Sequence, residues 1–226
     1  MEKIVIYGAG NVGKKALESL IRQNVYCCGG FLDDNLDKGT LVQNIPVIGG
    51  SNEIDIVYEK GINNYFVALG NNFFREKISS FLRNKGFNLV SIIDPSAFVS
   101  CEASIGEGVL VMPNCYIGHG AVLEDFSVCQ VASIISHYAK IGRAVNLSYG
   151  SIVSAYANIG KFSRIGIGAK IMNKINIGES SFIGAGAVVT QNIPSKVLAF
   201  GIPARVIREI DLENYNPNCK GGEKNE

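Results

Sequence analysis

Residues 99–124 read VSCEASIGEGVLVMPNCYIGHGAVLE, and every sixth residue counted from Val99 is aliphatic. The register continues to Val189 without interruption, so sixteen positions are apolar, and only Cys129 among them is not aliphatic. A mostly small residue stands two places before each of these positions, and glycine frequently follows directly. A period of six fits neither an amphipathic strand, whose period is two, nor a helix, whose period is 3.6.

This hexapeptide repeat predicts a left-handed parallel β-helix for residues 94–193. Each hexad forms one short strand and a turn, three hexads complete a coil, and the aliphatic column fills the interior of the prism. Successive coils rise by about 4.8 Å through ladder hydrogen bonds. Repeats with this spacing are left-handed, which is an exception to the usual right-handed crossover.

Residues 1–93 alternate strand and helix signals instead. Strand-like runs are KIVIYG, VYCCGGFLDD, PVIGG, NYFVALG and NLVSIID, and helical patterns lie between them in KKALESLIRQ, SNEIDIVYEKG and NNFFREKISSFLRNKG. The alternation predicts a small Rossmann-like α/β domain with a parallel sheet. Residues 194–226 are expected to cap the β-helix with a short extended segment and a terminal helix over QNIPSKVLAFGIPARVIREIDLENY, followed by a polar tail.

The composition argues against several classes of function. The 226 residues carry a formal net charge of +1, so no overall field favours nucleic acid. No apolar run approaches the ~18 residues that span a bilayer, and the N-terminus lacks a signal-peptide pattern. We therefore expect a cytoplasmic protein without membrane insertion. The six cysteines form no CxxC pair, and we expect no metal site.

His119 and His137 are the only two histidines, and each stands two residues after an aliphatic position, one coil apart. They should share one column of the β-helix, about one strand spacing from each other. If solenoids pack side by side, a histidine at such a corner lines a cleft and is a candidate general base. The alternative is that both are plain surface residues. Two histidines are too few for a zinc-dependent γ-type carbonic anhydrase, which needs three histidine ligands on the same fold.

The segment GAGNVG at residues 8–13 fits G-x-G-x-x-G between the first strand and the first helix. Asp33 and Asp34 follow the second strand, near the place where an acidic residue would hold a ribose, and Asn71 follows a later strand at the same edge. Only one mononucleotide-binding half is present, which favours a nucleotide diphosphate over NAD. The alternative is that these glycines only make a tight turn.

The order of a small α/β domain and a hexapeptide β-helix resembles the bacterial sugar O-/N-acyltransferases. These include the sialic acid O-acetyltransferases and the N-acetyltransferases of nucleotide-linked amino sugars. The resemblance covers essentially the whole chain and rests on IVIYGAGNVGKKAL, GGFLDDN, FVALGNNFFREKI, KGFNLVSIIDPSA, SIISHYAKIG and FGIPARVIR. The LDD and ALGNN segments point to this family in particular, because many acyltransferases share the hexapeptide portion.

The resemblance implies a homotrimer that uses acetyl-CoA, with active sites between neighbouring β-helices. It implies that His137 is the general base and that the backbone N–H of Ala155 stabilises the oxyanion. The residues that it places along CoA are Ile167, Ala185 and Arg205. The residues that it places around the sugar nucleotide are Gly8, Gly10, Asn11, Asp33, Asp34, Asn71 and Gln130.

Two positions depart from the family pattern. Asn11 and Val12 stand where the family commonly has a Gly-His pair that contacts the substrate. Tyr138 stands where the family often has an acidic residue that orients the base and supports its imidazolium form. A tyrosine can form a hydrogen bond there but carries no charge at neutral pH. Both departures indicate an altered acceptor or pH optimum and raise the question of lost activity.

We therefore predict an acetyl-CoA-dependent N-acetyltransferase for surface glycan synthesis. Its acceptor would be the amino group of a UDP-, dTDP- or GDP-linked 4-amino-dideoxyhexose. Two alternatives stay open: an O-acetyltransferase that acts on a sugar or sialic acid, and a non-catalytic scaffold that binds a nucleotide sugar.

Overall fold

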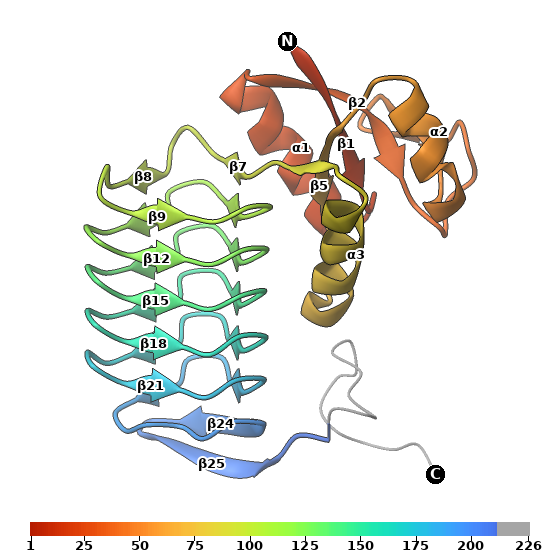
Figure 1. Cartoon of the computed structure of the whole chain (residues 1–226). Coiled ribbons are helices and arrows are strands. Elements are labelled where there is room, and N and C mark those ends of the chain that lie inside the picture. The colour runs from red at the N-terminus through yellow and green to blue at the C-terminus, as the bar shows by residue number, and fades with distance from the viewer. Residues whose placement is uncertain (212–226) are drawn as a thin grey trace.

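A computed structural model describes residues 1–211 of the chain. Figure 1 shows an α/β domain beside a tall prism of stacked strands. The strands of the α/β domain are β1 (Glu2–Tyr7), β2 (Tyr26–Leu32), β3 (Leu41–Val42), β4 (Ile45–Gly49), β5 (Asn64–Val67) and β6 (Asn88–Leu89). Its helices are α1 (Asn11–Gln23), the 3-10 helix η1 (Ser51–Glu53), α2 (Ile54–Glu59) and α3 (Asn72–Asn84). The predicted polar tail lies outside the described residues.

The α/β sheet has the order β3-β4-β2-β1-β5-β6, and all neighbours are parallel except the β3–β4 hairpin. The chain moves from β1 outward to β2 on one side and returns to add β5 on the other. The carboxyl ends of β1 and β5 therefore form the switch point of the sheet, where ligands bind in open α/β folds. We call the loops that follow β1, β2 and β5 the ligand edge.

The prism has three flat faces built from parallel two-residue strands, and the β10 face also contains two longer strands at its end. The β10 face contains β7 (Ile92–Ile93), β10 (Leu110–Val111), β13 (Val128–Cys129), β16 (Asn146–Leu147), β19 (Arg164–Ile165), β22 (Phe182–Ile183), β24 (Val197–Gly201) and β25 (Ala204–Glu209). The β11 face contains β8 (Phe98–Val99), β11 (Tyr116–Ile117), β14 (Ile134–Ile135), β17 (Ile152–Val153), β20 (Lys170–Ile171) and β23 (Val188–Val189). The β12 face contains β9 (Ser104–Ile105), β12 (Val122–Leu123), β15 (Lys140–Ile141), β18 (Asn158–Ile159) and β21 (Asn176–Ile177).

The repeat register accounts for this prism. Leu110 pairs in parallel with Val128, so partners on one face are 18 residues, or three hexads, apart. The second residue of nearly every strand points inward, and Ile117, Ile135 and Ile165 are fully buried. Cys129 fills the same interior column and is also fully buried. The predicted left-handed parallel β-helix is confirmed.

The boundary between the two parts differs from the expectation that NLVSIID forms one strand. Asn88–Leu89 pair with β5 in the α/β sheet, whereas Ile92–Ile93 pair with β10 of the β-helix. The reason is the register, because Ile93 stands six residues before Val99 and belongs to the inward column. The β-helix therefore begins one strand earlier than predicted.

The predicted terminal helix is wrong for the residues up to Glu209. Strands β24 and β25 form an antiparallel hairpin that extends the β10 face at the end of the prism. Gly201 at the turn has a φ of 103°, a conformation that favours glycine. The β-branched pair Val206 and Ile207 then suits the returning strand. The hairpin thus covers the last coil in the place of a helix.

Candidate active site

Each pair of faces meets at a corner, and the predicted site residues fall on two of the three corners. We call residues 119–121, 137–139 and 155–157 the His corner, which joins the β11 and β12 faces. The Ile167 corner comprises residues 149–151, 167–169 and 185–187 and joins the β10 and β11 faces. The α3 corner comprises residues 125–127, 143–145 and 161–163, and helix α3 covers it.

The His corner is a cluster of four aromatic rings. His137 meets Tyr138 and Tyr156 edge-on, with ring centroids 5.9 and 5.5 Å apart, while these two tyrosines stack on each other at 5.2 Å. His119 also meets Tyr138 edge-on, at 5.4 Å. The two histidines share a column as expected, and Tyr138 contacts both rings. Gly120 makes this possible, because a Cβ atom there would lie 2.5 Å from the ring of Tyr138.

His137 is exposed, and its Nδ1 lies 3.3 Å from the hydroxyl of Ser136. Ser136 therefore provides the polar partner that fixes this nitrogen, and Nε2 remains directed away from it. Tyr138 approaches the histidine only through its ring. It thus does not reproduce the hydrogen bond that an acidic residue would make.

Ala155 follows His137 by one coil in the same column. Its neighbour Tyr156 donates its N–H to the carbonyl oxygen of His137 at 3.2 Å. Within residues 1–211, the N–H of Ala155 itself donates to no protein acceptor. The corner therefore presents an imidazole and, one coil further along the prism, a backbone N–H without a protein acceptor.

The glycine-rich loop after β1 is built for close approach of the backbone. Gly8 has a φ of 105°, and a Cβ atom on it would lie 3.0 Å from the carbonyl oxygen of Ala68. A Cβ atom on Gly13 would lie 2.0 Å from the carbonyl oxygen of Gly8, so helix α1 packs directly on the loop. Gly10 has open space around it, and Asn11 is exposed at the start of α1. Gly8 and Gly13 therefore make a tight turn, while Gly10 leaves the ligand edge open beside it.

Asp33 and Asp34 are both engaged within the protein. Asp33 accepts a hydrogen bond from the N–H of Ala9 at 2.8 Å. Asp34 accepts from the hydroxyl of Tyr7 at 2.5 Å and from the N–H of Ser51 at 2.6 Å. The hydrogen bonds from Tyr7 and Ser51 lower the pKa of Asp34. Both residues thus fix the loops of the ligand edge, and any contact with a sugar nucleotide must use their remaining lone pairs.

Asn71 lies at this edge, in the loop that follows β5, whereas Gln130 lies on the β-helix. The side chain of Asn71 caps α3, because its oxygen accepts from the N–H groups of Phe73 and Phe74 at 3.0 and 3.1 Å. Only its amide nitrogen is left to donate to a ligand. Gln130 directly follows strand β13 of the β10 face, and its side-chain oxygen is buried without a hydrogen bond from any described residue. Because this oxygen is shielded from solvent, a ligand N–H reaches it only if the side chain of Gln130 moves.

The ligand edge is tied to the β-helix by an arginine that the sequence analysis missed. Arg75 is 1% exposed, and its guanidinium donates to the carbonyl oxygens of Leu69, Phe126 and Ala144 and to the side chain of Asn146, at 2.7–3.1 Å. Burial lowers the pKa of Arg75 to about 9, so it remains protonated at neutral pH. Asn146 donates in turn to the carbonyl oxygen of Gly70 at 3.1 Å.

A second polar tie lies one turn before Arg75, at the start of α3. Asn72 donates to the carbonyl oxygen of Phe162 at 2.5 Å, and the ring of Phe73 stacks on that of Phe162 at 4.7 Å. Asn72 is therefore turned to the β-helix and away from the ligand edge. The buried residues of α3 are Asn72, Arg75, Ser79 and Leu82, at helical spacing. Polar residues on the buried stripe of a helix were the available signal for this junction.

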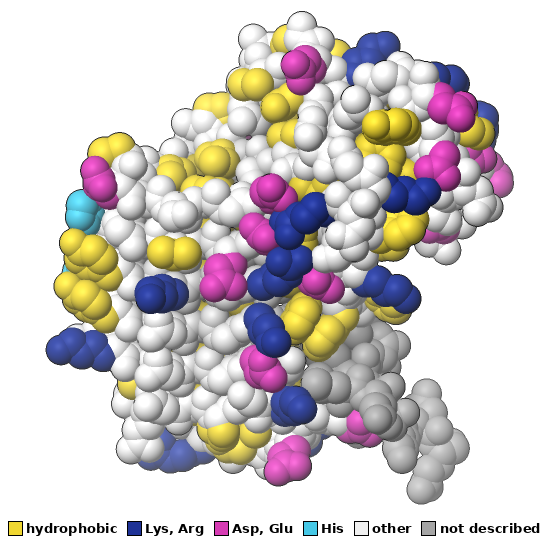
Figure 2. All heavy atoms as spheres, in the orientation of Figure 1, with side chains coloured by type: hydrophobic (Ala, Val, Ile, Leu, Met, Phe, Trp, Pro, Cys, Tyr) yellow, Lys and Arg dark blue, Asp and Glu magenta, His cyan; other side chains and the backbone are white. Residues whose placement is uncertain are grey.

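Charged side chains surround the same junction, and Figure 2 shows acidic and basic groups gathered there. Arg83 lies 2.7 Å from both Glu107 and Asp125, and Arg143 lies 3.2 Å from both Asp125 and Glu76. Burial opposes the ionisation of Asp125, but hydrogen bonds and the two arginines outweigh it, so its pKa is lowered. The network therefore holds α3 against the β-helix in its ionised form.

The residues expected along CoA lie on a different corner from His137. Ile167 and Ala185 are exposed on successive coils of the Ile167 corner, where Gly186 donates to the carbonyl oxygen of Ile167 at 2.8 Å. Arg205 is exposed on the terminal hairpin, beyond these coils. In Figure 2 the histidines lie on the edge of the prism away from the α/β domain. One chain therefore does not bring together His137, the CoA residues and the ligand edge.

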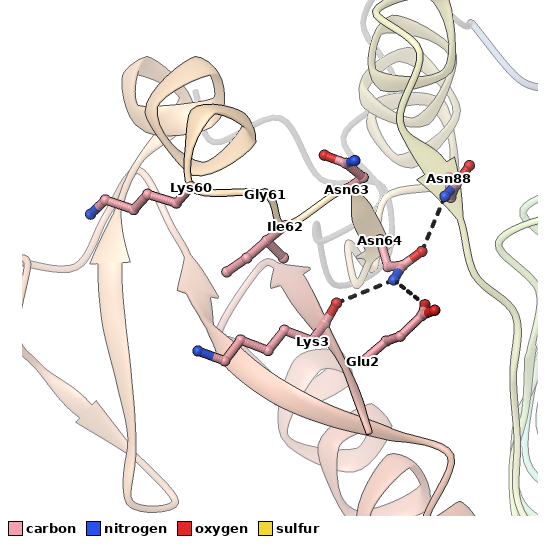
Figure 3. A pocket seen from close by; sticks show the side chains of 8 residues that line it. All are labelled: Glu2, Lys3, Lys60, Gly61, Ile62, Asn63, Asn64 and Asn88. Atoms are coloured by element: carbon pink, nitrogen blue, oxygen red, sulfur yellow. Dashed lines mark hydrogen bonds between the residues drawn. The ribbon is translucent and has the colours of Figure 1, made fainter.

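A hollow does occur within one chain, but at the opposite edge of the α/β sheet. It is lined by Glu2, Lys3, Lys60, Gly61, Ile62, Asn63, Asn64 and Asn88, as Figure 3 shows. The amide of Asn64 donates to Glu2 at 3.0 Å and to the carbonyl oxygen of Lys3 at 3.3 Å, so the polar groups largely satisfy one another. This pocket lies at the amino ends of the strands, away from every predicted site residue.

Comparisons with known proteins identify the family of this chain. The model of the PglD N-terminal domain family matches residues 3–82. PerB from Caulobacter crescentus, solved in complex with CoA and GDP-perosamine, is 31% identical, with a TM-score of 0.88 over 92% of this chain and 98% of that one. The acetyltransferase domain of PglB from Neisseria gonorrhoeae is 32% identical, with a TM-score of 0.86 over 92% of this chain and 100% of that one. The chain belongs to the bacterial sugar acyltransferase family.

A curated relative of this acyltransferase is a GDP-perosamine N-acetyltransferase from Escherichia coli. It is 29% identical over 150 residues, which cover 64% of this chain and 66% of that protein. In the part of this acyltransferase that the structure describes, no helix has the length and apolar character needed to cross a membrane. The same residues contain no group of three or more histidine, cysteine or acidic side chains placed to bind a metal ion.

Proposed function

We propose that this acyltransferase transfers the acetyl group of acetyl-CoA to the amino group of a nucleotide-linked amino sugar. The observation that carries the proposal is the match over nearly the full length of both chains to PerB, which was solved with CoA and GDP-perosamine. The exposed imidazole and free backbone donor of the His corner supply the groups that acyl transfer needs. Because acetyl-CoA is a cytoplasmic metabolite in bacteria, the proposal places the enzyme in the cytoplasm.

The reaction assigns one task to each group of the His corner. The amine nitrogen attacks the thioester carbon while His137 accepts a proton from the amine. The oxyanion that forms accepts a hydrogen bond from the N–H of Ala155. Collapse of the tetrahedral intermediate breaks the carbon–sulfur bond, and His137 returns its proton to the departing thiolate. The products are an acetamido sugar and free CoA, and Ser136 orients the imidazole throughout.

A homotrimer would complete the site, and the faces of the prism support it. The outward residues of the β11 face include Phe98, Tyr116 and Ile134, which are 38–56% exposed. The corresponding residues of the β12 face include Lys140 and Asn158. An exposed apolar face of this kind is typical of a protein interface.

A three-fold arrangement with the β11 faces turned inward has a direct consequence for the corners. The His corner and the Ile167 corner are the two edges of the β11 face. Rotation about the axis therefore brings the His corner of one subunit against the Ile167 corner of the next. His137 would then face the CoA path and the ligand edge of a neighbouring chain, which one chain alone leaves apart.

The test is acetyl transfer from acetyl-CoA to GDP-, UDP- and dTDP-linked 4-amino sugars, followed by thiol release and product mass. We expect turnover with one acceptor, and a loss of about 10²–10⁴-fold in His137→Ala, because general base catalysis is removed. His119→Ala is the matched control, since it removes an imidazole one coil away. Turnover of hydroxyl acceptors only, or equal loss in both variants, would contradict the proposal.

A further inference from the structure

Helix α1, which follows the glycine-rich loop, makes a side-chain contact with the Ile167 corner that the proposed mechanism does not use. The ammonium group of Lys15, in the first turns of α1, donates a hydrogen bond to the hydroxyl of Tyr149. The same ammonium lies 4.8 Å from the centre of the Tyr149 ring. Lys15 is partly buried, and Tyr149 remains 37% exposed. A cation from the α/β domain thus holds a tyrosine on the β-helix while leaving it accessible.

The hydroxyl of Tyr149 still has a hydrogen to donate. It accepts from Lys15, and no acceptor for its own O–H occurs among residues 1–211. A tyrosine hydroxyl serves as donor and acceptor at once. The pair therefore presents two kinds of donor to a ligand that lies between α1 and the Ile167 corner: the remaining N–H groups of Lys15 and the O–H of Tyr149.

The height of Tyr149 along the prism places it opposite the reacting groups. It stands 12 residues after His137 and 6 before Ala155, which are two thirds and one third of a coil. With a rise of about 4.8 Å per coil, these steps correspond to roughly 3 and 2 Å. In a trimer with parallel prism axes, Tyr149 of one subunit lies between the heights of His137 and Ala155 of the next. It also precedes Ile167, on the CoA path, by one coil.

We propose that Lys15 and Tyr149 form a clasp that binds the acceptor between its diphosphate and its amine. This inference rests on the proposed function and names two residues that set the specificity for the sugar. Lys15 carries the charge that a diphosphate requires, and it projects from the helix that follows the glycine-rich loop. Tyr149 lies farther from that loop, on the corner that meets the base, so its hydroxyl donates to the hexose.

The test compares Lys15→Met and Tyr149→Phe with wild type and with Lys14→Met. The last variant removes the same charge from an exposed neighbour in the same turn of α1. The measurements are kcat, the KM values for acetyl-CoA and for the best acceptor, and competitive inhibition by the free nucleoside diphosphate. We expect Tyr149→Phe to raise the acceptor KM about 3- to 10-fold, as for a lost neutral hydrogen bond, with inhibition by the diphosphate unchanged.

For Lys15→Met we expect both the acceptor KM and the inhibition constant of the diphosphate to rise about 10- to 100-fold, because a charged hydrogen bond is lost. The acceptor KM and the inhibition constant of the diphosphate should also depend less on ionic strength in this variant. Lys14→Met should leave both within about twofold of wild type. The KM for acetyl-CoA should not change in any variant. Equal effects of the two lysine variants, or an effect of Tyr149→Phe on acetyl-CoA alone, would overturn the clasp.

A wild-type enzyme that acetylates no amino sugar would refute the proposed function and not the clasp. In that case calorimetric titration with the sugar nucleotide and with the free nucleoside diphosphate compares the same four proteins. Tyr149→Phe must then weaken the binding of the sugar nucleotide but not that of the free nucleoside diphosphate. Lys15→Met must weaken the binding of both ligands. Unchanged binding in both variants would refute the clasp.

Discussion

At the residue scale, the two glycines Gly10 and Gly13 stand three positions apart and meet different surroundings. A Cβ atom on Gly13 would lie 2.0 Å from the carbonyl oxygen of Gly8, whereas one on Gly10 would touch nothing within 4 Å. We expect Gly13→Ala to destabilise the protein by about 1–3 kcal/mol, because helix α1 must move off the loop. Alanine's better helix propensity offsets about 1 kcal/mol at most.

Gly10→Ala is the matched control for this prediction. It should change stability by less than about 1 kcal/mol, since only the preference at the N-cap is affected. Urea unfolding followed by circular dichroism measures both variants, which suits a chain without tryptophan. Equal stability of the two variants would mean that the loop relaxes easily and that α1 does not depend on Gly13.

Single residues differ in how far the sequence predicts them. The inward column was predictable residue by residue, because Ile135 or Ile165 repeats the same environment in every coil. Arg75 was not, because its partners at Phe126 and Ala144 are more than fifty residues away and are backbone atoms. Asp33 illustrates a third case: its place at the ligand edge was expected, but its bond to the N–H of Ala9 depends on loop geometry.

At the scale of elements, α3 is anchored by Arg75 more than by its surface charges. Arg75→Met leaves two buried carbonyl oxygens and one partly buried carbonyl oxygen without their donor, and each buried loss costs about 1–3 kcal/mol. We expect a total loss of stability above about 3 kcal/mol, together with a higher KM for the acceptor, because Leu69 lies on the ligand edge. Urea unfolding and steady-state kinetics measure the two effects.

Arg83→Met on the same helix is the control for Arg75. Its ion pairs with Glu107 and Asp125 are partly exposed, so their removal should cost about 1 kcal/mol or less. A milder effect of Arg75→Met than of Arg83→Met would show that solvent, rather than the guanidinium, satisfies the carbonyl groups at the junction.

The elements that sequence patterns predicted well are those with a strong internal period. The two-residue strands of the β-helix follow from the hexads, and α1 and α3 follow from amphipathic spacing. The segment at Val206 and Ile207 was misread as helix, because its apolar and charged residues fit both patterns over so short a stretch. Pairing with β24 decides its structure, and that contact depends on the end of the prism.

At the scale of the whole molecule, the β11 face predicts an assembly. Ile134 points outward from this face and Val122 points outward from the β12 face, each as the first residue of a two-residue strand. We expect Ile134→Glu to give a smaller species in light scattering and sedimentation, because a carboxylate would be buried without a partner. Acetyl transfer should fall with it, since the His corner would lose its neighbour.

Val122→Glu places the same charge in the same strand position on the polar face. It should keep the mass and activity of wild type. If Ile134→Glu also keeps both, the β11 face is not the interface, and the site must be completed in another way. The architecture of the chain could be predicted from its repeat. The proposed pairing of corners across subunits could not, because it depends on how the three faces of the prism are arranged around it.

The pairing of Leu110 with Val128 also limits how such a chain can change in length. An insertion of one residue within a strand would turn its interior side chain toward solvent unless the next corner bulges outward to absorb it. An insertion of a complete coil would preserve every environment and lengthen the prism by about 4.8 Å. The length of the prism therefore changes most simply by whole coils. Each added coil would move the terminal hairpin farther from the α/β domain. The number of coils therefore sets the distance between the terminal hairpin and the α/β domain.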